Sequence, residues 1–268
     1  MNPESSGETA GVRTILTWNV NGLRQRHTMN EFLPIFQEIP DIVCIQETKT
    51  QQEKIPREIR DLPGYYKYCA PAVRGSFTEV MLFTREQPVS IRYGFDSNPV
   101  PESESRVMIA DFGRFILVNI YFPLGMVPVG TLEQKLAFYD AFLVLAENLN
   151  NAGRPVIICG DFSIAHTDTD VQVIKRRTAL RVGTTRVEQE KIHALVCLGY
   201  RDVFRMIHRE KRIYTWWPNG FKNTDRLRGY RLDYFFANER AATSIVDTEI
   251  LDRVEGSDHC PVVLRMRR

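Results

Sequence analysis

The chain has no cysteine pattern that would hold a zinc ion or a framework of disulfide bonds. Its five cysteines are odd in number, widely scattered and never spaced as C-x-x-C: Cys44, Cys69, Cys159, Cys197 and Cys260. Three of them lie in apolar runs, which is typical of small buried core residues. We therefore expect a cytoplasmic protein, associated with the nucleoid in a prokaryote or placed in the nucleus of a eukaryote.

Long apolar runs are also absent. No stretch approaches the roughly 18 apolar residues that span a bilayer, and the first residues lack the apolar segment of a signal peptide. Residues 1–12 are instead polar and rich in Glu, Ser and Gly, so we expect a disordered tail there. Repeats and low-complexity tracts are missing, so residues 13–268 are expected to fold as one domain that acts as a monomer away from membranes.

The chain carries little net charge, because 35 Lys and Arg against 33 Asp and Glu leave +2. The basic residues are nevertheless concentrated in two stretches. Residues 171–187 hold five basic residues and no acid, and residues 205–231 hold eight basic residues with two acids. Such stretches fit a polyanionic partner, but a solvated surface gives the same pattern, and both interpretations stay open.

Short β-branched runs alternate with amphipathic segments from Thr14 onward, which indicates an α/β protein with mixed sheets. Helical periodicity is clearest in three segments, and Gly153 and Gly199 stand where the last two should stop. The helices are expected at Met29–Glu38, Leu132–Asn150 and Arg186–Leu198. The strands are expected at Thr14–Trp18, Asp41–Ile45, Glu79–Thr84, Val107–Asp111, Phe115–Tyr121, Pro155–Cys159, Tyr214–Trp217, Arg231–Ala237 and Pro261–Arg265.

Polar side chains follow or precede several of these apolar strands. A carboxylate beside a buried strand costs several kcal/mol unless it is paired or bound to a metal ion. Each acid taken alone has an ordinary explanation as a capping or ion-pairing residue. Together they form an oxygen-rich set without cysteine, which suits a hard cation such as Mg²⁺ or Mn²⁺. The set comprises Asn19, Asn21, Glu47, Asp161, Asp233 and Asp258.

His259 stands next to Asp258 in the last of these segments. A lone histidine is more often a hydrogen-bonded structural residue than a catalyst, and the adjacent acid shifts that balance only modestly. Hydrolysis of a phosphodiester requires an activated water, neutralisation of charge at phosphorus and help for the leaving oxygen. A metal ion, an imidazole and a carboxylate can supply all three.

Seven short motifs follow one another along the chain: W-N-V-N-G-L-R (Trp18–Arg24), Q-E-T-K (Gln46–Lys49), N-I-Y-F-P (Asn119–Pro123), G-D-F (Gly160–Phe162), Y-T-W-W (Tyr214–Trp217), R-L-D-Y (Arg231–Tyr234) and G-S-D-H (Gly256–His259). They resemble the motifs of the exonuclease III family of abasic-site endonucleases, and their order is the same. G-S-D-H alone would indicate only the wider deoxyribonuclease I-like superfamily, whereas the segments Asn119–Pro123 and Tyr214–Tyr234 favour its DNA-repair branch. The resemblance covers essentially all of Thr14–Arg265.

The resemblance implies a four-layer α/β sandwich, in which two packed mixed β-sheets are flanked by helices and the active site lies at one end of the sheets. It also implies a Mg²⁺ or Mn²⁺ ion. Glu47 resembles the principal ligand of this ion, with Asn19, Asp258 and Asp161 nearby.

The resemblance assigns further roles by position. Asp161 resembles the residue that activates or orients the attacking water, and His259 resembles the residue that holds the phosphate or stabilises its developing charge. Asp233 resembles the carboxylate that orients His259, and Tyr121 resembles a tyrosine that contacts the phosphate. Asn19 belongs to this catalytic group, and so does the position of Ser163.

An apolar niche for a flipped sugar is expected from Trp216, Tyr230 and Leu232. Such a niche would admit a sugar without a base more easily than a complete nucleotide. From the residues alone, an aromatic core cluster is the ordinary explanation for the same side chains.

Departures from the family pattern lie near the expected site, among them Tyr230 in place of a tryptophan. Ser163 replaces an asparagine of the G-D-x-N motif, and Leu124 replaces an asparagine after the Y-x-P sequence. Glu79 places an acid where a DNA backbone would approach, and Leu227 replaces another asparagine. We therefore hypothesise an enzyme with its metal and His/Asp machinery intact but with slower or redirected cleavage.

The resemblance thus implies a magnesium-dependent endodeoxyribonuclease that cuts double-stranded DNA 5′ to abasic sites, with 3′→5′ exonuclease activity as a further expectation. Two alternatives remain open. One is a catalytically weak DNA-binding paralogue, which the departures at Ser163, Leu124 and Glu79 would explain. The other is a phosphodiesterase of the same superfamily that acts on RNA or on a small phosphate ester.

Overall fold

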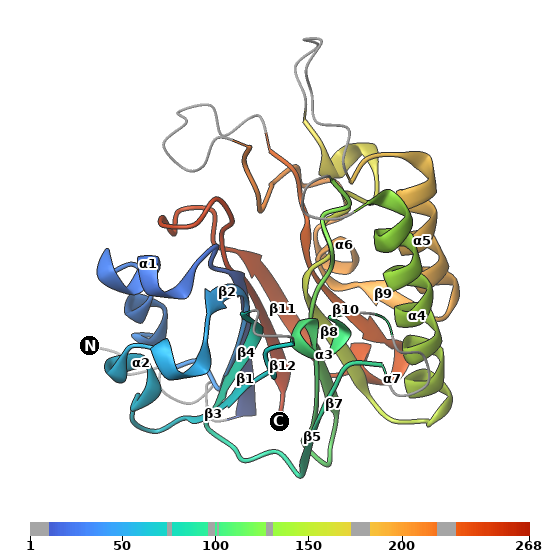
Figure 1. Ribbon diagram of the computed structural model, residues 1–268. Coiled ribbons are helices and arrows are strands. Elements are labelled where there is room, and N and C mark those ends of the chain that lie inside the picture. The colour runs from blue at the N-terminus through green and yellow to red at the C-terminus, as the bar shows by residue number, and fades with distance from the viewer. Residues whose placement is uncertain are drawn as a thin grey trace, which may run out of the picture.

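Two six-stranded mixed sheets form the centre of the molecule in this computed structural model (Figure 1). The structure describes residues 11–73, 77–95, 100, 102–126, 131–172, 183–218 and 229–268. The expected tail lies outside these residues except for its last two positions. None of the helices in the described part of the chain combines the length and apolar character needed to cross a membrane.

The first sheet has the strand order β11-β12-β1-β2-β4-β3. Its strands β1 and β2 run parallel, and the other neighbours are antiparallel. The strands are β1 (Val12–Asn19), β2 (Ile42–Thr50), β3 (Tyr66–Cys69), β4 (Thr78–Thr84), β11 (Ile245–Ile250) and β12 (Val262–Arg267).

The second sheet has the order β5-β6-β7-β8-β10-β9, with β7 and β8 parallel. Its strands are β5 (Ser90–Tyr93), β6 (Val107–Asp111), β7 (Ile116–Tyr121), β8 (Val156–Asp161), β9 (Tyr200–Asp202) and β10 (Asp233–Asn238). The two sheets therefore repeat one plan, in which a parallel pair lies at the centre between antiparallel neighbours.

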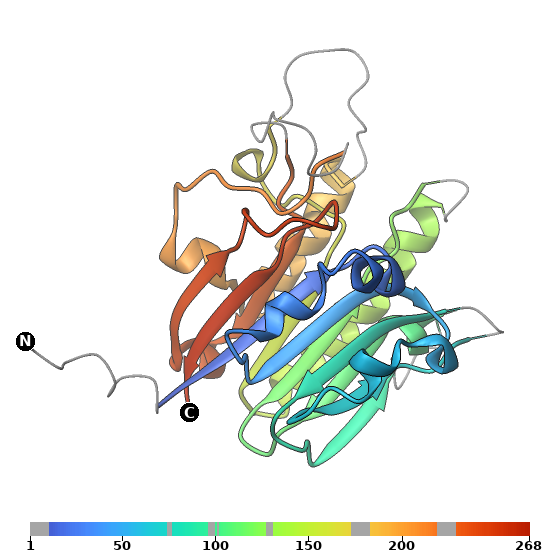
Figure 2. The ribbon, with the colours of Figure 1, turned by 90° about the vertical axis from the view of Figure 1, so that its left-hand side faces the viewer.

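Helices cover the outer face of each sheet, whereas α3 (Ser103–Arg106) and α6 (Val203–Ile207) contact strands of both sheets (Figures 1 and 2). The longest are α4 (Leu132–Asn151) and α5 (Arg186–Cys197), which pack on the second sheet, and both begin with a capping box, at Thr131 and Thr185. The shorter elements are α1 (Leu23–Thr28), η2 (Leu33–Phe36), η3 (Gln52–Lys54), α2 (Arg57–Arg60), α3 (Ser103–Arg106), η4 (Asp168–Asp170), α6 (Val203–Ile207) and α7 (Glu239–Ala242).

Three apolar clusters fill the spaces between the layers. One joins the inner faces of both sheets and includes Ile42 and Ile157. A second joins the second sheet to α4 and α5, and a third joins the first sheet to α1, η2 and α2. This arrangement of helix, sheet, sheet and helix confirms the four-layer α/β sandwich.

Two of the expected elements are wrong. The helix expected at Met29–Glu38 is replaced by α1, which ends at Thr28, and by the single 3-10 turn η2. Asn30 and Ile39 have positive φ angles of 57° and 49°, which a continuous α-helix does not tolerate.

The segment Tyr214–Trp217 forms isolated bridges to Tyr230 and His259 rather than a strand. The amide groups of Thr215 and Trp216 both donate to the Tyr230 carbonyl, at 2.9 Å, so no alternating ladder forms. The helices Leu132–Asn150 and Arg186–Leu198 are confirmed to within one residue.

Candidate active site

The ends of the central strands of both sheets bring the candidate side chains together. Asn19 ends β1, Glu47 lies near the end of β2, and Asp161 ends β8. Asp233 begins β10 directly opposite Asp161, because these two strands are antiparallel. His259 precedes β12, so the site combines residues from both sheets at the end of the molecule where α1 begins, toward the top of Figure 1.

Gly160 allows β7 and β8 to approach closely beside the site. Its φ is +138°, and a Cβ atom there would lie 1.9 Å from the carbonyl oxygen of Ile120. Only glycine fits such a position without moving the backbone. The close pairing sets Tyr121 opposite Asp161 across the parallel strands.

Glu47 is presented by a bulge in β2. Its φ is +50° and that of Lys49 is +48°, and the pairing with β4 shifts register between Gln46 and Thr50. One carboxylate oxygen of Glu47 accepts a hydrogen bond from Asn19 Nδ2 at 2.9 Å, and the other lies 2.7 Å from Lys49 Nζ. Burial works to raise the pKa of Glu47, but Lys49 and Asn19 outweigh it and hold that pKa below its ordinary value.

Asp161 is buried at the centre of the site. Its Oδ1 accepts the amide of Ser163 at 2.7 Å, and its Oδ2 accepts Asn19 Nδ2 at 2.9 Å. Burial raises the pKa of Asp161 to about 7, with His259 opposing the shift and the negative charges of Asp233 and Glu47 adding to it. A carboxylate with a pKa near neutrality is suited to take a proton in a reaction at physiological pH.

His259 is buried between two carboxylates. Its Nδ1 lies 2.8 Å from Asp233 Oδ2, and its Nε2 lies 3.8 Å from Asp161 Oδ2. Burial alone would lower the pKa of His259, but Asp233 and Asp161 outweigh burial and raise the pKa to about 10. The imidazole is therefore held protonated, and Nε2 is a hydrogen-bond donor directed at the site.

Glu47, Asp161 and His259 each offer a ligand atom, and these atoms all lie within 4.8 Å of one another. The side-chain nitrogen of Asn19 lies between the carboxylates of Glu47 and Asp161. Its side-chain oxygen points away from them, because it accepts a hydrogen bond from the Asn21 amide at 3.0 Å. In this arrangement Asn19 spaces the carboxylates, and it does not present its oxygen between them.

Asp258 is held slightly apart from that group. Its two oxygens accept hydrogen bonds from Asn21 Nδ2 at 2.7 Å and from Trp216 Nε1 at 2.9 Å. These contacts connect the loop after β1 to the expected sugar niche. Burial works to raise the pKa of Asp258, but His259 and the two donors outweigh it and lower the pKa.

Tyr121 lies beside Glu47, and Arg106 of α3 stacks on its ring at 4.6 Å from the centroid. Burial and the negative charge of Glu47 raise the pKa of Tyr121 well above its ordinary value. The phenol therefore keeps its proton at neutral pH and can donate it in a hydrogen bond to a phosphate oxygen.

The three residues of the expected niche do cluster. Tyr230 and Leu232 are buried together with Ala165, and the half-buried Trp216 packs against them. The rings of Trp216 and Tyr230 lie 5.3 Å apart in an edge-to-face arrangement, and the ring of His259 lies 6.3 Å from that of Trp216. An apolar wall thus stands directly beside the buried imidazole.

The residues at which the chain departs from the family pattern differ in how deeply they are buried. Ser163 is buried, with a left-handed φ of +51°, and its hydroxyl lies 3.3 Å from Asp161 Oδ1. Leu124 is half-buried, and its carbonyl accepts a hydrogen bond from Lys135. Leu227 lies outside the described residues. Glu79 faces the charges of Arg106 and Glu47, among others.

Glu79 should make the stability of the protein depend on pH. Burial raises its pKa from 4.5 to about 7, so its neutral form is favoured in the folded protein. The stability that this proton contributes is present below pH 4.5 and is lost as the pH rises through about 7. We therefore expect Glu79→Gln to match the wild type at pH 4 and to be more stable by about 1–2 kcal/mol at pH 8, a figure reduced for the partial exposure of the side chain.

Urea unfolding at both pH values in the presence of a chelator measures this difference. Glu104→Gln, at an exposed position of α3, is the matched control for the change in net charge, and it should show no such pH dependence. A Glu79→Gln advantage that is equal at pH 4 and pH 8 would contradict the expectation.

The basic stretches contribute partly to the interior. Arg231 is fully buried, and its guanidinium donates to Asp170 Oδ1 at 2.8 Å and to Asp202 Oδ1 at 3.1 Å. Arg205 also pairs with Asp170. At the surface, Arg186 pairs with Glu190 one helical turn away. Several other basic residues of the two stretches lie outside the described residues: Lys175, Arg176, Arg177, Arg181, Lys222, Arg226 and Arg228.

The site also includes a buried pair of charged residues that the sequence analysis does not predict. Lys135 of α4 and Glu188 of α5 form a buried ion pair of 2.7 Å. The signal was present, because Lys135 stands on the apolar face of α4, in phase with Phe138 and Phe142. A lysine on the buried face of a helix needs a partner of opposite charge, because a buried charge without one is unfavourable.

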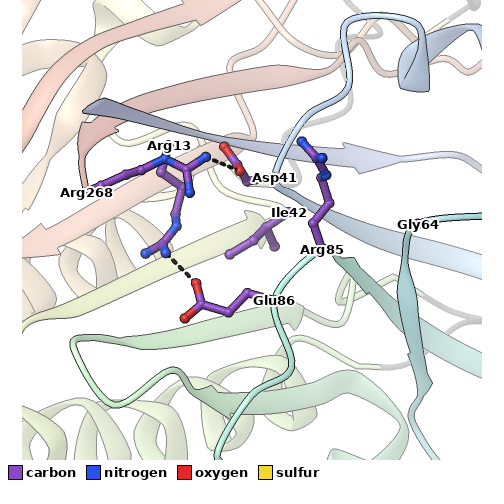
Figure 3. Close-up of a pocket in the computed structure, with 7 residues that line it drawn as sticks. All are labelled: Arg13, Asp41, Ile42, Gly64, Arg85, Glu86 and Arg268. Atoms are coloured by element: carbon purple, nitrogen blue, oxygen red, sulfur yellow. Dashed lines mark hydrogen bonds and ion pairs between the residues drawn. The ribbon is translucent and has the colours of Figure 1, made fainter. Parts of the chain in front are cut away.

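A hollow of about 320 Å³ lies at the opposite end of β1 (Figure 3). Its lining includes Arg13, which pairs with Glu86 at 2.5 Å, and Arg268, which pairs with Asp41 at 2.5 Å. These charged residues of the hollow are paired with one another. The hollow lies at the start of β1, whereas Asn19 ends that strand, so the hollow is separate from the candidate active site.

The sequence matches the endonuclease/exonuclease/phosphatase family over residues 16–259. It is 30% identical to the exodeoxyribonuclease of Bacillus subtilis over 252 residues, which cover 93% of this chain and 98% of that protein. It is 33% identical to recombination repair protein 1 of Drosophila melanogaster, where the match covers 93% of this chain but 36% of that longer protein. The structure of an AP endonuclease from Archaeoglobus fulgidus is similar with a TM-score of 0.80 at 27% identity, over 94% of this chain and 98% of that one.

Proposed function

Because the chain belongs to the endonuclease/exonuclease/phosphatase family, we propose that it is a DNA repair nuclease that hydrolyses the backbone 5′ to abasic sites, with additional 3′→5′ exonuclease activity. The observation that carries the proposal is the convergence of Glu47, Asp161 and His259 at the ends of two sheets. The names of the matched proteins, an exodeoxyribonuclease and an AP endonuclease, support the choice of DNA as substrate.

The donor set fits a hard divalent cation, with Mg²⁺ or Mn²⁺ as our proposal. Glu47 and Asp161 supply carboxylate oxygens, and no thiolate lies among the converging groups. The two carboxylates would hold the ion, while His259, whose Nδ1 lies 2.8 Å from Asp233 Oδ2, is placed to contact the phosphate. Such an ion, when bound, supplies neutralisation of the charge that develops at the phosphate.

The protein groups around it have complementary tasks. Asp161 accepts a proton from the attacking water, whose oxygen bonds to phosphorus while the bond from phosphorus to the 3′ oxygen breaks. The departing 3′ oxygen takes up a proton from solvent water. His259, kept protonated by Asp233, donates a hydrogen bond to a phosphate oxygen, and Tyr121 donates another. The products are a 3′-hydroxyl end and a 5′-phosphate on the abasic sugar.

The apolar wall beside His259 supports the choice of an abasic sugar. Trp216, Tyr230 and Leu232 offer an apolar surface against which a flipped sugar can pack. Trp216 is anchored to Asp258, which holds the wall at a fixed distance from the catalytic group. A sugar without a base requires less room than a complete nucleotide, so this wall favours the damaged site.

Cleavage of labelled duplexes tests the proposal. Duplexes that carry an abasic site, a uracil or a 3′ recessed end are incubated with Mg²⁺ and with chelator. We expect incision of the abasic duplex that depends on the metal and that is lost in Glu47→Ala and His259→Ala. Tight binding of duplex without metal and without incision of any substrate would instead favour a DNA-binding protein of low catalytic power.

Ser163→Asn tests whether the departure at this position limits the rate. The left-handed backbone at Ser163 is one that asparagine adopts readily, so we expect the variant to fold normally. A longer amide can reach the phosphate or the attacking water, and one such hydrogen bond to a developing oxyanion is worth up to about a hundredfold in kcat. Single-turnover incision of an abasic duplex measures the gain, and an unchanged rate would show that Ser163 does not limit cleavage.

A further inference from the structure

Lys135 is a fully buried cation whose three donor directions are all occupied. Its Nζ donates to Glu188 Oε1 at 2.7 Å, to the Ser163 carbonyl at 2.7 Å and to the Leu124 carbonyl at 3.3 Å. The side chains of Lys135 and Glu188 are 0% and 2% exposed. Burying such a pair is weak evidence for a contribution to stability, because the cost of desolvation often equals the Coulombic gain.

The three acceptors come from three separate segments around the site. Ser163 follows the catalytic strand β8, Leu124 follows β7 and Tyr121, and Glu188 belongs to the first turn of α5. Glu188 in turn accepts the amide groups of Gly183 and Thr185, at 3.0 and 3.1 Å. One ammonium group therefore joins the loops that carry the site to the start of α5.

A short chain of hydrogen bonds leads from Lys135 to Asp161. The carbonyl of Ser163 accepts from Lys135, and the amide of the same residue donates to Asp161 Oδ1 at 2.7 Å. Ser163 adopts a left-handed φ of +51°, which requires support from its surroundings. Asp161 is also among the charges that act on Lys135, whose pKa burial lowers and Glu188 and Asp161 raise.

Two of the three contacts of Lys135 are made to the main-chain carbonyls of Leu124 and Ser163, so these two do not depend on the side chains at positions 124 and 163. These are two of the positions at which this chain departs from its family pattern. The neighbouring Gly125 has a φ of +78°, and a Cβ atom there would lie 2.8 Å from Lys135 Cδ. The glycine leaves room for the lysine stem beneath the loop.

The geometry points to Lys135 and Glu188 as a positioning pair for the proposed reaction: their ion pair fixes the backbone of Ser163 through its carbonyl, so that the Ser163 amide keeps the Asp161 carboxylate aimed at the attacking water. The pair does not touch substrate. This inference rests on the proposed nuclease function for its kinetic consequence, whereas its structural part can be tested without any DNA.

The double variant Lys135→Met/Glu188→Gln tests the inference. Methionine preserves the length of the lysine stem, glutamine retains the capping box of α5, and no lone charge is left buried. Asp140→Asn/Lys191→Met is the matched control, because Asp140 and Lys191 also pair α4 with α5, at 2.5 Å, but lie at the surface.

Two measurements are made on each variant. In amide hydrogen exchange, Ser163 should exchange at least about tenfold faster in the double variant, because its hydrogen bond to Asp161 is weakened. The Phe162 amide, which donates to the Leu232 carbonyl at 2.9 Å, should be unchanged. In kinetics on an abasic duplex, kcat should fall by about 10–100-fold with KM changed by less than about threefold, since a small misplacement of a catalytic group has effects of this size.

The outcomes separate the two claims. The positioning role would be overturned if the Ser163 amide exchanged at the same rate in the double variant, the control and the wild type. It would also be overturned if the Ser163 and Phe162 amides both exchanged faster by the same factor, because that result indicates a general loosening of the fold. A wild type that cuts no DNA would remove the proposed function, and the exchange data would then decide the positioning role alone. If the double variant does not fold, Lys135→Gln replaces it, and wild-type exchange and kcat in that variant would contradict the inference.

Discussion

Asp161→Asn is expected to reduce kcat for incision of an abasic duplex by at least about a thousandfold. Asparagine has nearly the same shape and can still accept the Ser163 amide, but it cannot take a proton from the attacking water. General-base catalysis by a positioned side chain contributes about 10²–10⁴ in rate. In this site the second oxygen of the same carboxylate would also hold the divalent ion, so the loss should lie near the upper end of that range.

Single-turnover incision at saturating enzyme measures this effect without interference from product release. Asp168→Asn is the matched control, because Asp168 is exposed on the 3-10 turn η4 and its replacement changes the net charge equally. The control should cut at the wild-type rate. An Asp161→Asn enzyme that retains more than about a tenth of wild-type kcat would exclude Asp161 as the general base.

Arg231→Met is expected to destabilise the protein by about 3–5 kcal/mol, although Arg231 touches none of the catalytic atoms. The change leaves Asp170 and Asp202 buried with part of their compensating charge removed, and uncompensated buried charge has a cost of this size. Arg231 also stacks on Tyr234, at 4.3 Å from the ring centroid, so packing is lost as well.

Urea unfolding at neutral pH measures the loss of stability from Arg231→Met. Arg186→Met serves as the control, because the exposed pair of Arg186 and Glu190 should contribute less than about 0.5 kcal/mol. A loss below about 1 kcal/mol in Arg231→Met would mean that the buried network of Asp170, Arg231 and Asp202 is not needed for stability.

The accuracy of the predicted strands follows their position in the sheets. All the strands at interior positions of the two sheets were predicted, including β7 and β8, whose residues are buried throughout. The strands that were missed are the four at sheet edges, β3, β5, β9 and β11. Edge strands are exposed along one side, so their sequences are shorter or more polar and resemble loops.

The candidate catalytic residues could be predicted because polar side chains at the ends of apolar strands are conspicuous. Glu47, Asp161 and Asp233 each interrupt or border a buried run, and the structure places them around His259. What could not be predicted is which atoms face the site. The hydrogen bond from the Asn21 amide turns the oxygen of Asn19 away, and this contact depends on the loop conformation after β1.

The number of basic residues in a stretch of sequence does not predict how much positive charge that stretch places at the surface. Arg205 and Arg231 raised the local positive charge in the sequence, yet both are neutralised in the buried network with Asp170 and Asp202. A burial pattern that depends on three distant segments cannot be seen in a local count of charges. The same applies to Lys135, whose partner Glu188 lies 53 positions away.

The ends produced by a single cut distinguish metal-dependent hydrolysis 5′ to an abasic site from any other cleavage. A 5′-labelled strand with a single abasic site in duplex DNA is incubated with the protein and Mg²⁺, and the product is resolved beside size markers and then offered to a DNA polymerase. We expect one product that ends at the nucleotide before the abasic site, carries a 3′-hydroxyl group that the polymerase extends, and is absent with chelator. A product that cannot be extended, or the same product in the presence of chelator, would contradict this expectation.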